Sequence, residues 1–161
     1  MKRFLLVGAI AAAFAMVSCD EVKDAIDDIQ KDNEPTYVES KDGLTITVSY
    51  AKNGISGETV AKFKVDKSGE QHYLSDTVCT SFISKTSYIS EAVAKRAYEE
   101  LKTESDELTE ITYDNKKTIS VDYKDYVGFE KPMAVWALQS ILETYKMIYS
   151  GSSQITDIGQ K

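Results

Sequence analysis

The stretch LTITVSY, residues 44–50, decides the fold prediction because its apolar and hydroxyl side chains alternate strictly. Successive side chains of a strand point to opposite faces, so the two kinds of residue are expected on opposite sides of a sheet. The apolar residues are Leu44, Ile46, Val48 and Tyr50, and the hydroxyl residues are Thr45, Thr47 and Ser49. One covered face and one polar face are typical of an antiparallel sheet.

Four further segments have the same two-residue period and are predicted as strands: residues 61–65, 74–82, 111–113 and 119–123. We expect Asn53-Gly54 and Gly57 to supply positive-φ positions for the first turn, and residues 114–116 to form a later one. By the same alternation, three tyrosines are expected to face the core: Tyr50, Tyr113 and Tyr123.

Two segments have a helical period instead. Apolar residues recur every four positions from Ile89 to Leu101, and Ser87 or Ser90 can cap a helix over about 90–103. Pro132 starts a second amphipathic helix over 133–149. The order is βββαββα, which predicts an α+β fold: an antiparallel sheet of about five strands with two helices on one face, within residues 42–150. Residues 151–161 are expected to be a flexible tail.

Composition and charge narrow the function classes. The chain has 161 residues, 42% of them hydrophobic, which suits one globular domain. It contains 19 Lys and Arg residues and 26 Asp and Glu residues. The first 18 residues contain two of the basic residues and none of the acidic ones. A nucleic-acid partner is disfavoured because phosphate binding needs clustered Lys and Arg.

The N-terminus has the layout of a signal peptide, predicted over residues 1–18. Lys2 and Arg3 precede an uncharged apolar run from Phe4 to Val17, which is too short for a permanent transmembrane helix. Where this run ends, Met16-Val17-Ser18-Cys19 resembles the lipobox of bacterial lipoproteins. The resemblance implies cleavage before Cys19 and acylation of that residue, so that acyl chains hold the protein on a membrane. An ordinary secretory peptide with a chance cysteine is the alternative.

Acidic residues follow Cys19 at once. Asp20, Glu21 and Asp24 resemble the sorting signal that sends some lipoproteins to the outer cell surface, whereas in other lineages an Asp at this place retains lipoproteins in the inner membrane. We expect the protein to be anchored in the outer membrane and to face outwards. Residues 19–41 are predicted to be an acidic tether. A calcium loop is disfavoured because the Asp residues lack the required spacing and glycine.

Candidate chemistry is sparse. His72 is the only histidine, and acylation of Cys19 would leave Cys79 without a disulfide partner, so neither a metal site nor a cofactor is expected. A Cys79/His72 nucleophile pair is disfavoured, because their odd separation puts them on opposite faces of one strand. Carboxylates near the end of the first helix offer a hydrolase alternative but are more simply a solvated rim: Glu99, Glu100, Glu104, Asp106 and Glu107.

Ten tyrosines are unusual for this length, and exposed tyrosines make good contact points. Four lie near the ends of predicted elements and are candidate binding residues: Tyr37, Tyr88, Tyr126 and Tyr149. The hydroxyl face of Thr45, Thr47 and Ser49, with Thr118 and Ser120, could join them. The sequence favours a non-catalytic, lipid-anchored binding or accessory domain for an envelope protein or extracellular ligand. A small hydrolase and an inhibitor or immunity protein are the alternatives.

Overall fold

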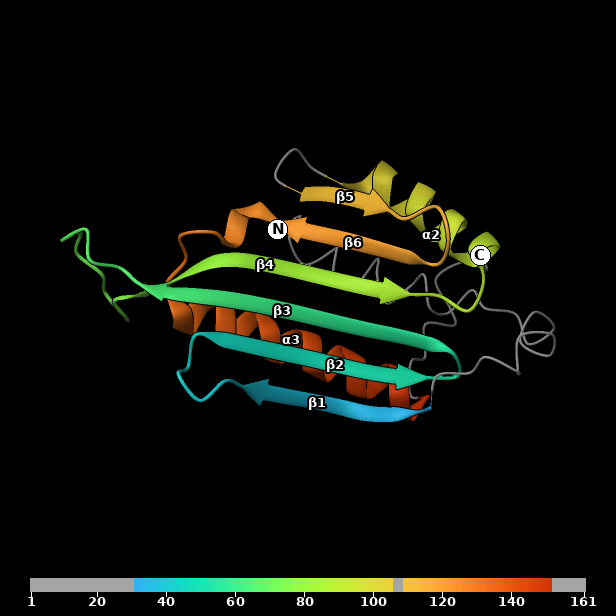
Figure 1. Cartoon of the computed structure of the whole chain (residues 1–161), viewed down its shortest axis with the longest axis horizontal. Helices are drawn as coiled ribbons and strands as arrows, with labels where there is room; N and C mark the ends of the chain where they lie inside the picture. Colours follow the sequence, from blue (N-terminus) through green and yellow to red (C-terminus); the bar gives the residue numbers. More distant parts are fainter. Residues whose placement is uncertain (1–30, 106–108, 152–161) are drawn as a thin grey trace, which may run out of the picture.

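The computed structural model describes residues 31–105 and 109–151, which form one antiparallel sheet and two helices (Figure 1). The strands are β1 (Asn33–Glu39), β2 (Thr45–Lys52), β3 (Ile55–Val65), β4 (Thr77–Ser87), β5 (Thr109–Tyr113) and β6 (Thr118–Tyr123). They lie in the order β1-β2-β3-β4-β6-β5. The predicted α+β class and antiparallel sheet are confirmed. The sheet has six strands, however, so the predicted count of five and the predicted element order both lack one strand.

The additional strand is β1, within residues predicted as tether. Its Tyr37 pairs with Val48 of β2, and the register shifts between Asn33 and Thr36, where Pro35 lies. Proline has no N–H for a ladder, which local rules treat as a sign against a strand, but an edge strand tolerates it. Tertiary pairing with β2 therefore outweighs the polar local sequence.

Strand β3 begins six residues before the predicted segment. Gly57 lies inside it rather than in the turn, which is formed by Asn53 and Gly54 at positive φ. A Cβ on Gly57 would come within 2.6 Å of the Tyr50 ring and 3.0 Å of the Tyr145 ring. Gly57 is thus required by close packing in the core, not by a turn conformation.

Strand β4 also differs from its prediction. It starts at Thr77 and runs to Ser87, so Leu74 belongs to the preceding loop, where 64% of its surface is exposed. The register against β3 shifts so that Ser81 pairs with Lys62 and Cys79 with Phe63. This irregularity turns Cys79 into the core, where it is a free, buried cysteine.

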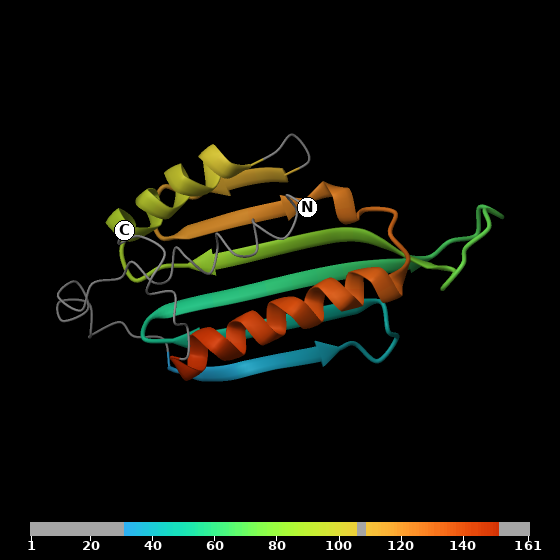
Figure 2. The ribbon, with the colours of Figure 1, turned by 180° about the vertical axis from the view of Figure 1, so that it is seen from behind.

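Helices α2 (Glu91–Glu104) and α3 (Lys131–Ser150) cover the same face of the sheet, as predicted (Figure 2). The Ser90 hydroxyl accepts the Val93 N–H at 3.3 Å and caps α2, while α3 has Pro132 in its first turn and ends at Gly151 with φ +70°. Helix α3 packs on β1 to β4 and α2 on β5 and β6. None of the helices in the described ranges is long and apolar enough to cross a membrane.

The core between helices and sheet contains the three tyrosines predicted to face it. Tyr50 and Tyr123 are buried, and Tyr113 is half-buried against the same cluster. The predicted signal peptide, Cys19, the acidic residues after it, Asp106, Glu107 and the tail from residue 152 lie outside the described residues.

Candidate functional site on the helix-free face

The sheet face away from the helices carries mainly hydroxyl side chains. Thr45, Thr47 and Ser49 of β2 are half-buried on this face, as the alternation predicted. The Ser49 hydroxyl lies 3.1 Å from that of Thr36 in β1. Strand pairing extends the same pattern to the far side of the sheet, where the hydroxyls of Ser87 in β4 and Thr118 in β6 are 3.1 Å apart.

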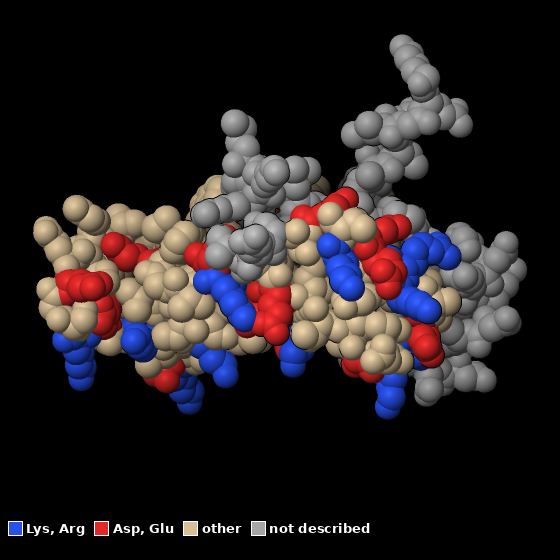
Figure 3. All heavy atoms as spheres, turned by 90° about the horizontal axis from the view of Figure 1, so that it is seen from above, with Lys and Arg blue, Asp and Glu red and all other residues tan. Residues whose placement is uncertain are grey.

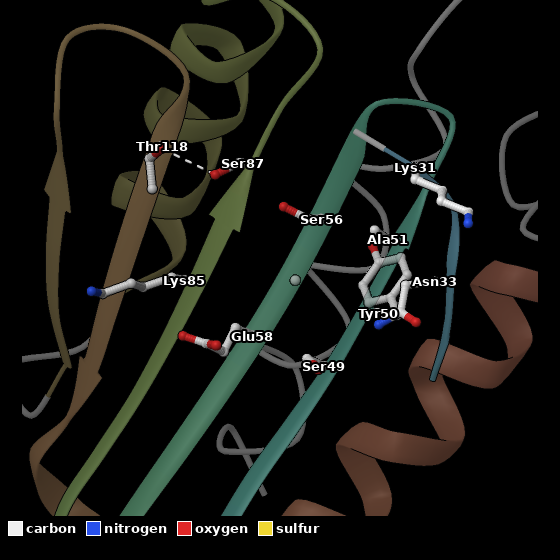
Figure 4. Close-up of a pocket in the computed structure, with 11 residues that line it drawn as sticks. Lys31, Asn33, Ser49, Tyr50, Ala51, Ser56, Glu58, Lys85, Ser87 and Thr118 are labelled. Atoms are coloured by element: carbon white, nitrogen blue, oxygen red, sulfur yellow. Dashed lines mark hydrogen bonds between the residues drawn. The ribbon is translucent and has the colours of Figure 1, made fainter. Parts of the chain in front are cut away.

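A depression of about 350 Å³ lies on this face near the β2–β3 turn (Figure 4). Glu58 of β3 and Lys85 of β4 are direct cross-strand partners within it, and they supply one negative and one positive charge. The other polar side chains at its walls are Lys31, Asn33, Ser49, Ser56, Ser87 and Thr118. Opposite charges among donor and acceptor groups are suited to a polar ligand rather than to an apolar one.

Lysines give the helix-free face more positive charge than the acidic composition suggests. Lys62 and Lys64 of β3 and Lys85 of β4 are exposed at positions whose side chains alternate away from the core. In Figure 3 the lower side of the molecule is the helix-free face, and blue side chains project from it. The acidic groups Glu58, Glu110 and Asp122 share this face, so its charges are mixed rather than uniformly basic.

The four candidate tyrosines do not join this face. Tyr37 is half-buried and pairs with Val48 on the helix side, and burial raises the pKa of its hydroxyl. Tyr126 stacks on Phe82 with ring centroids 4.5 Å apart, and the Lys52 ammonium lies 5.0 Å from the ring of Tyr149.

Tyr88 is a clear correction to the predicted surface. It is only 2% exposed and belongs to the core between α2 and the sheet, so it cannot contribute to a contact surface. Its position two residues before Ser90, the cap of α2, indicated an element end, but the side chain turns inward there.

The Cys79/His72 pair is not assembled as a nucleophile and base. The Cys79 thiol donates to the Ser81 carbonyl oxygen at 3.4 Å, and burial raises its pKa, which disfavours the thiolate. His72 Nε2 instead lies 2.8 Å from the Asp66 carboxylate.

Five described carboxyl groups have pKa values below their ordinary range: Asp42, Asp66, Glu110, Asp114 and Glu130. The leading cause in each is a hydrogen bond to the charged form, for example from the Ser68 hydroxyl to Asp66 and from the Tyr73 N–H to Glu130. A general acid for sugar hydrolysis needs the opposite shift. Within residues 31–105 and 109–151, no three His, Cys, Asp or Glu side chains are placed to hold a metal ion.

One group that sequence reasoning missed is Glu130, the residue before α3. Its carboxylate accepts the backbone N–H groups of Tyr73 and Ser75, each at 2.9 Å, and that of Leu74. The acceptor and donors are more than fifty positions apart along the chain, so no local motif could have indicated the contact.

Comparisons with known proteins identify no relative. No protein-family model, no curated protein and no solved structure matches the chain.

Proposed function

We propose that this chain is a lipid-anchored cell-envelope protein whose domain binds a polar partner, either another envelope protein or an extracellular ligand, without catalysis. The observation that carries the binding role is the depression on the helix-free face, where Glu58 and Lys85 stand among hydroxyl side chains from four strands. No described helix covers this face of the sheet, so the charged and hydroxyl groups are accessible to one ligand at the same time.

The electrostatics favour binding over the hydrolase alternative. Each described carboxyl group with a shifted pKa is stabilised in its charged form, mostly by hydrogen bonds within loops and turns. Glu99, Glu100 and Glu104 lie on α2, on the opposite side of the sheet from the depression. A cleft with two opposed carboxylates, as sugar hydrolysis requires, is therefore not supported by these groups.

The anchor in this proposal is Cys19, with acyl chains holding the mature protein on the outer membrane and Asp20, Glu21 and Asp24 as its sorting signal. We expect wild-type protein to partition into the detergent phase of Triton X-114 and Cys19→Ala protein to stay aqueous or unprocessed. Intact-mass measurement should find a chain that begins at Cys19 and carries diacylglycerol. Equal partitioning of both proteins would reject the anchor.

The binding face is tested by photo-crosslinking on intact cells. We expect p-benzoylphenylalanine at position 56, in the depression, to give a discrete adduct, and the same group at position 103, on the solvent side of α2, to give none. Lys85→Glu should abolish the adduct from position 56, while Lys95→Glu should preserve it, since both lysines are exposed and only Lys85 lines the depression. Equal adducts with both charge reversals would reject this face as the binding site.

A further inference from the structure

The connection between β3 and β4 forms a loop, Asp66–Asp76, that projects beyond the end of the sheet (Figure 1). Two large side chains of this loop are open to solvent: Tyr73 is 87% exposed and Leu74 64%. Val65, at the base of the loop, is 51% exposed. Adjacent apolar side chains this accessible on a projecting loop are a common mark of a contact site.

The loop is held in shape by two carboxylates. Glu130 accepts three successive backbone N–H groups, those of Tyr73, Leu74 and Ser75. Because these contacts use the backbone, the side chains of Tyr73 and Leu74 are free to point outward. Glu130 is itself fixed to the fold, since it pairs with Val78 of β4 in an isolated bridge directly before α3.

Asp66 organises the base of the loop. Its carboxylate accepts the Ser68 hydroxyl at 2.8 Å and the Ser68 N–H at 3.0 Å, and it lies 2.8 Å from His72 Nε2. These contacts lower the pKa of Asp66 to about 2, so the carboxylate is charged at neutral pH. The Asp66 N–H also donates to the Asp76 carbonyl oxygen at 2.7 Å and closes the loop. A loop ordered before binding loses less conformational entropy when it binds.

The position of the loop relative to the point where the chain enters the sheet bears on the kind of partner that the loop contacts. Asp32 accepts the Asn53 N–H at 2.9 Å, so the chain enters the sheet at the β2–β3 turn. The eleven residues of β3 separate that turn from Val65 by about 35 Å. If Cys19 carries the anchor, as proposed above, the anchored segment joins the sheet at the end opposite to the loop.

Charge also argues against a lipid surface as the partner. The loop contains three acids, Asp66, Glu70 and Asp76, against the single base Lys67, so its formal charge is −2. Anionic lipid would repel these groups, whereas a basic protein surface would attract them.

We propose that the loop Asp66–Asp76 is a preformed docking element, in which Tyr73 and Leu74 enter a small apolar pocket with a basic rim on a protein partner. The inference that the partner is a protein and not the membrane rests on the proposed anchor at Cys19. The conformation of the loop and the exposure of Tyr73 and Leu74 do not depend on that anchor. This contact is separate from the depression on the helix-free face, which lies toward the other end of the sheet.

The test uses full-length protein processed in cells, with p-benzoylphenylalanine at position 73 and, as control, at position 147, where Met147 is 51% exposed on α3. We expect one discrete protein adduct from position 73 and none from position 147. The captured protein is then purified, and its affinity for the unmodified chain is measured. Tyr73→Ala/Leu74→Ala should weaken binding by about 30-fold or more, as expected for central interface residues, and Met147→Ala by less than about 2-fold.

Two more measurements separate docking from a structural effect. Glu130→Gln retains both contact side chains but replaces the acceptor of three N–H groups, so we expect weaker binding together with faster hydrogen exchange at Tyr73, and unchanged exchange in β2. Binding of the unmodified chain should weaken as salt rises, because the loop is acidic.

The proposal is overturned by equal binding of Tyr73→Ala/Leu74→Ala and wild type, or by the absence of an adduct from position 73. It is also overturned if vesicles of phosphatidylethanolamine and phosphatidylglycerol bind wild-type protein but not the double variant, since that result makes the loop a membrane contact. The adduct from position 73 should still form in the Lys85→Glu variant. The proposal for the helix-free face and the proposal for the loop can therefore be rejected independently of each other.

Discussion

Gly57→Ala should destabilise the domain, although it adds only one methyl group. The new Cβ would lie 2.6 Å from Cε1 of Tyr50 and 3.0 Å from Cζ and the hydroxyl of Tyr145, whereas carbon atoms in good contact are about 3.5–4.0 Å apart. Neither ring can withdraw easily, because both are buried and their centroids are 4.4 Å apart. The Tyr145 hydroxyl is also 3.1 Å from Oγ1 of Thr59, a contact that a shifted ring would lose.

The magnitude follows from these contacts. Overpacking of a buried site costs about 1–3 kcal/mol, and loss of one buried hydrogen bond about 1 kcal/mol more, so the free energy of unfolding should fall by about 2–4 kcal/mol. With an m value of about 2 kcal/mol/M, the urea midpoint measured by circular dichroism should fall by about 1–2 M.

A matched substitution separates packing from backbone conformation. Gly69 has φ +84°, and a Cβ added there would meet nothing within 4 Å, so Gly69→Ala should lose only the cost of a left-handed alanine, about 1 kcal/mol. Adding Tyr50→Leu to Gly57→Ala removes the ring atom that the new methyl meets, so the double variant should lose less stability than the sum of the two single variants. A Gly57→Ala protein as stable as wild type, or losses that add fully, would refute the packing explanation.

Three further results are expected. As pH falls, the loop should open before the sheet unfolds. The pKa values of Asp66 and Glu130 are below their ordinary 3.8 and 4.5, so the stabilisation from these carboxylates is complete above those values. It is lost as pH falls through the lowered pKa values, of which that of Asp66 is about 2. Hydrogen exchange at the Tyr73 amide checks this, and pH-independent protection would contradict it. Cys79 should react with a thiol reagent slowly in the native protein and rapidly in urea, because it is buried and burial raises its pKa; fast native labelling would mean that β4 opens. Ser90→Ala should lower the free energy of unfolding by about 1 kcal/mol in a urea titration, and no loss would show that the contact with the Val93 N–H contributes little.

The core elements were predictable because their signals are local. The alternation over residues 44–50 placed Ile46, Val48 and Tyr50 in the core, and the serine before Glu91 indicated the start of α2. Both patterns depend on neighbours within a few residues, and they fixed the α+β class without any knowledge of tertiary contacts.

Errors occurred where tertiary contacts outweigh local signals. Gly57 resembled a turn residue because glycine commonly supplies positive φ, but two tyrosine rings from β2 and α3 exclude a side chain there. Pro35 and its acidic neighbours indicated a tether, but an edge position beside β2 accommodates them. Leu74 continued the alternating pattern of β4 by parity alone, although the strand begins three residues later.

The docking loop could not have been predicted from the sequence, because it depends on contacts between distant residues. In the local sequence, Glu130 is recognisable only as the residue before a helix, and 57 positions separate it from Tyr73. The carboxylate reaches the loop only because Val78 of β4 pairs with Glu130, which sets the residue before α3 beside the start of that strand. The backbone contacts then leave Tyr73 and Leu74 facing outward. A chain that retained the core pattern but lost the Glu130 carboxylate would therefore keep the sheet and helices while losing the presentation of these two side chains.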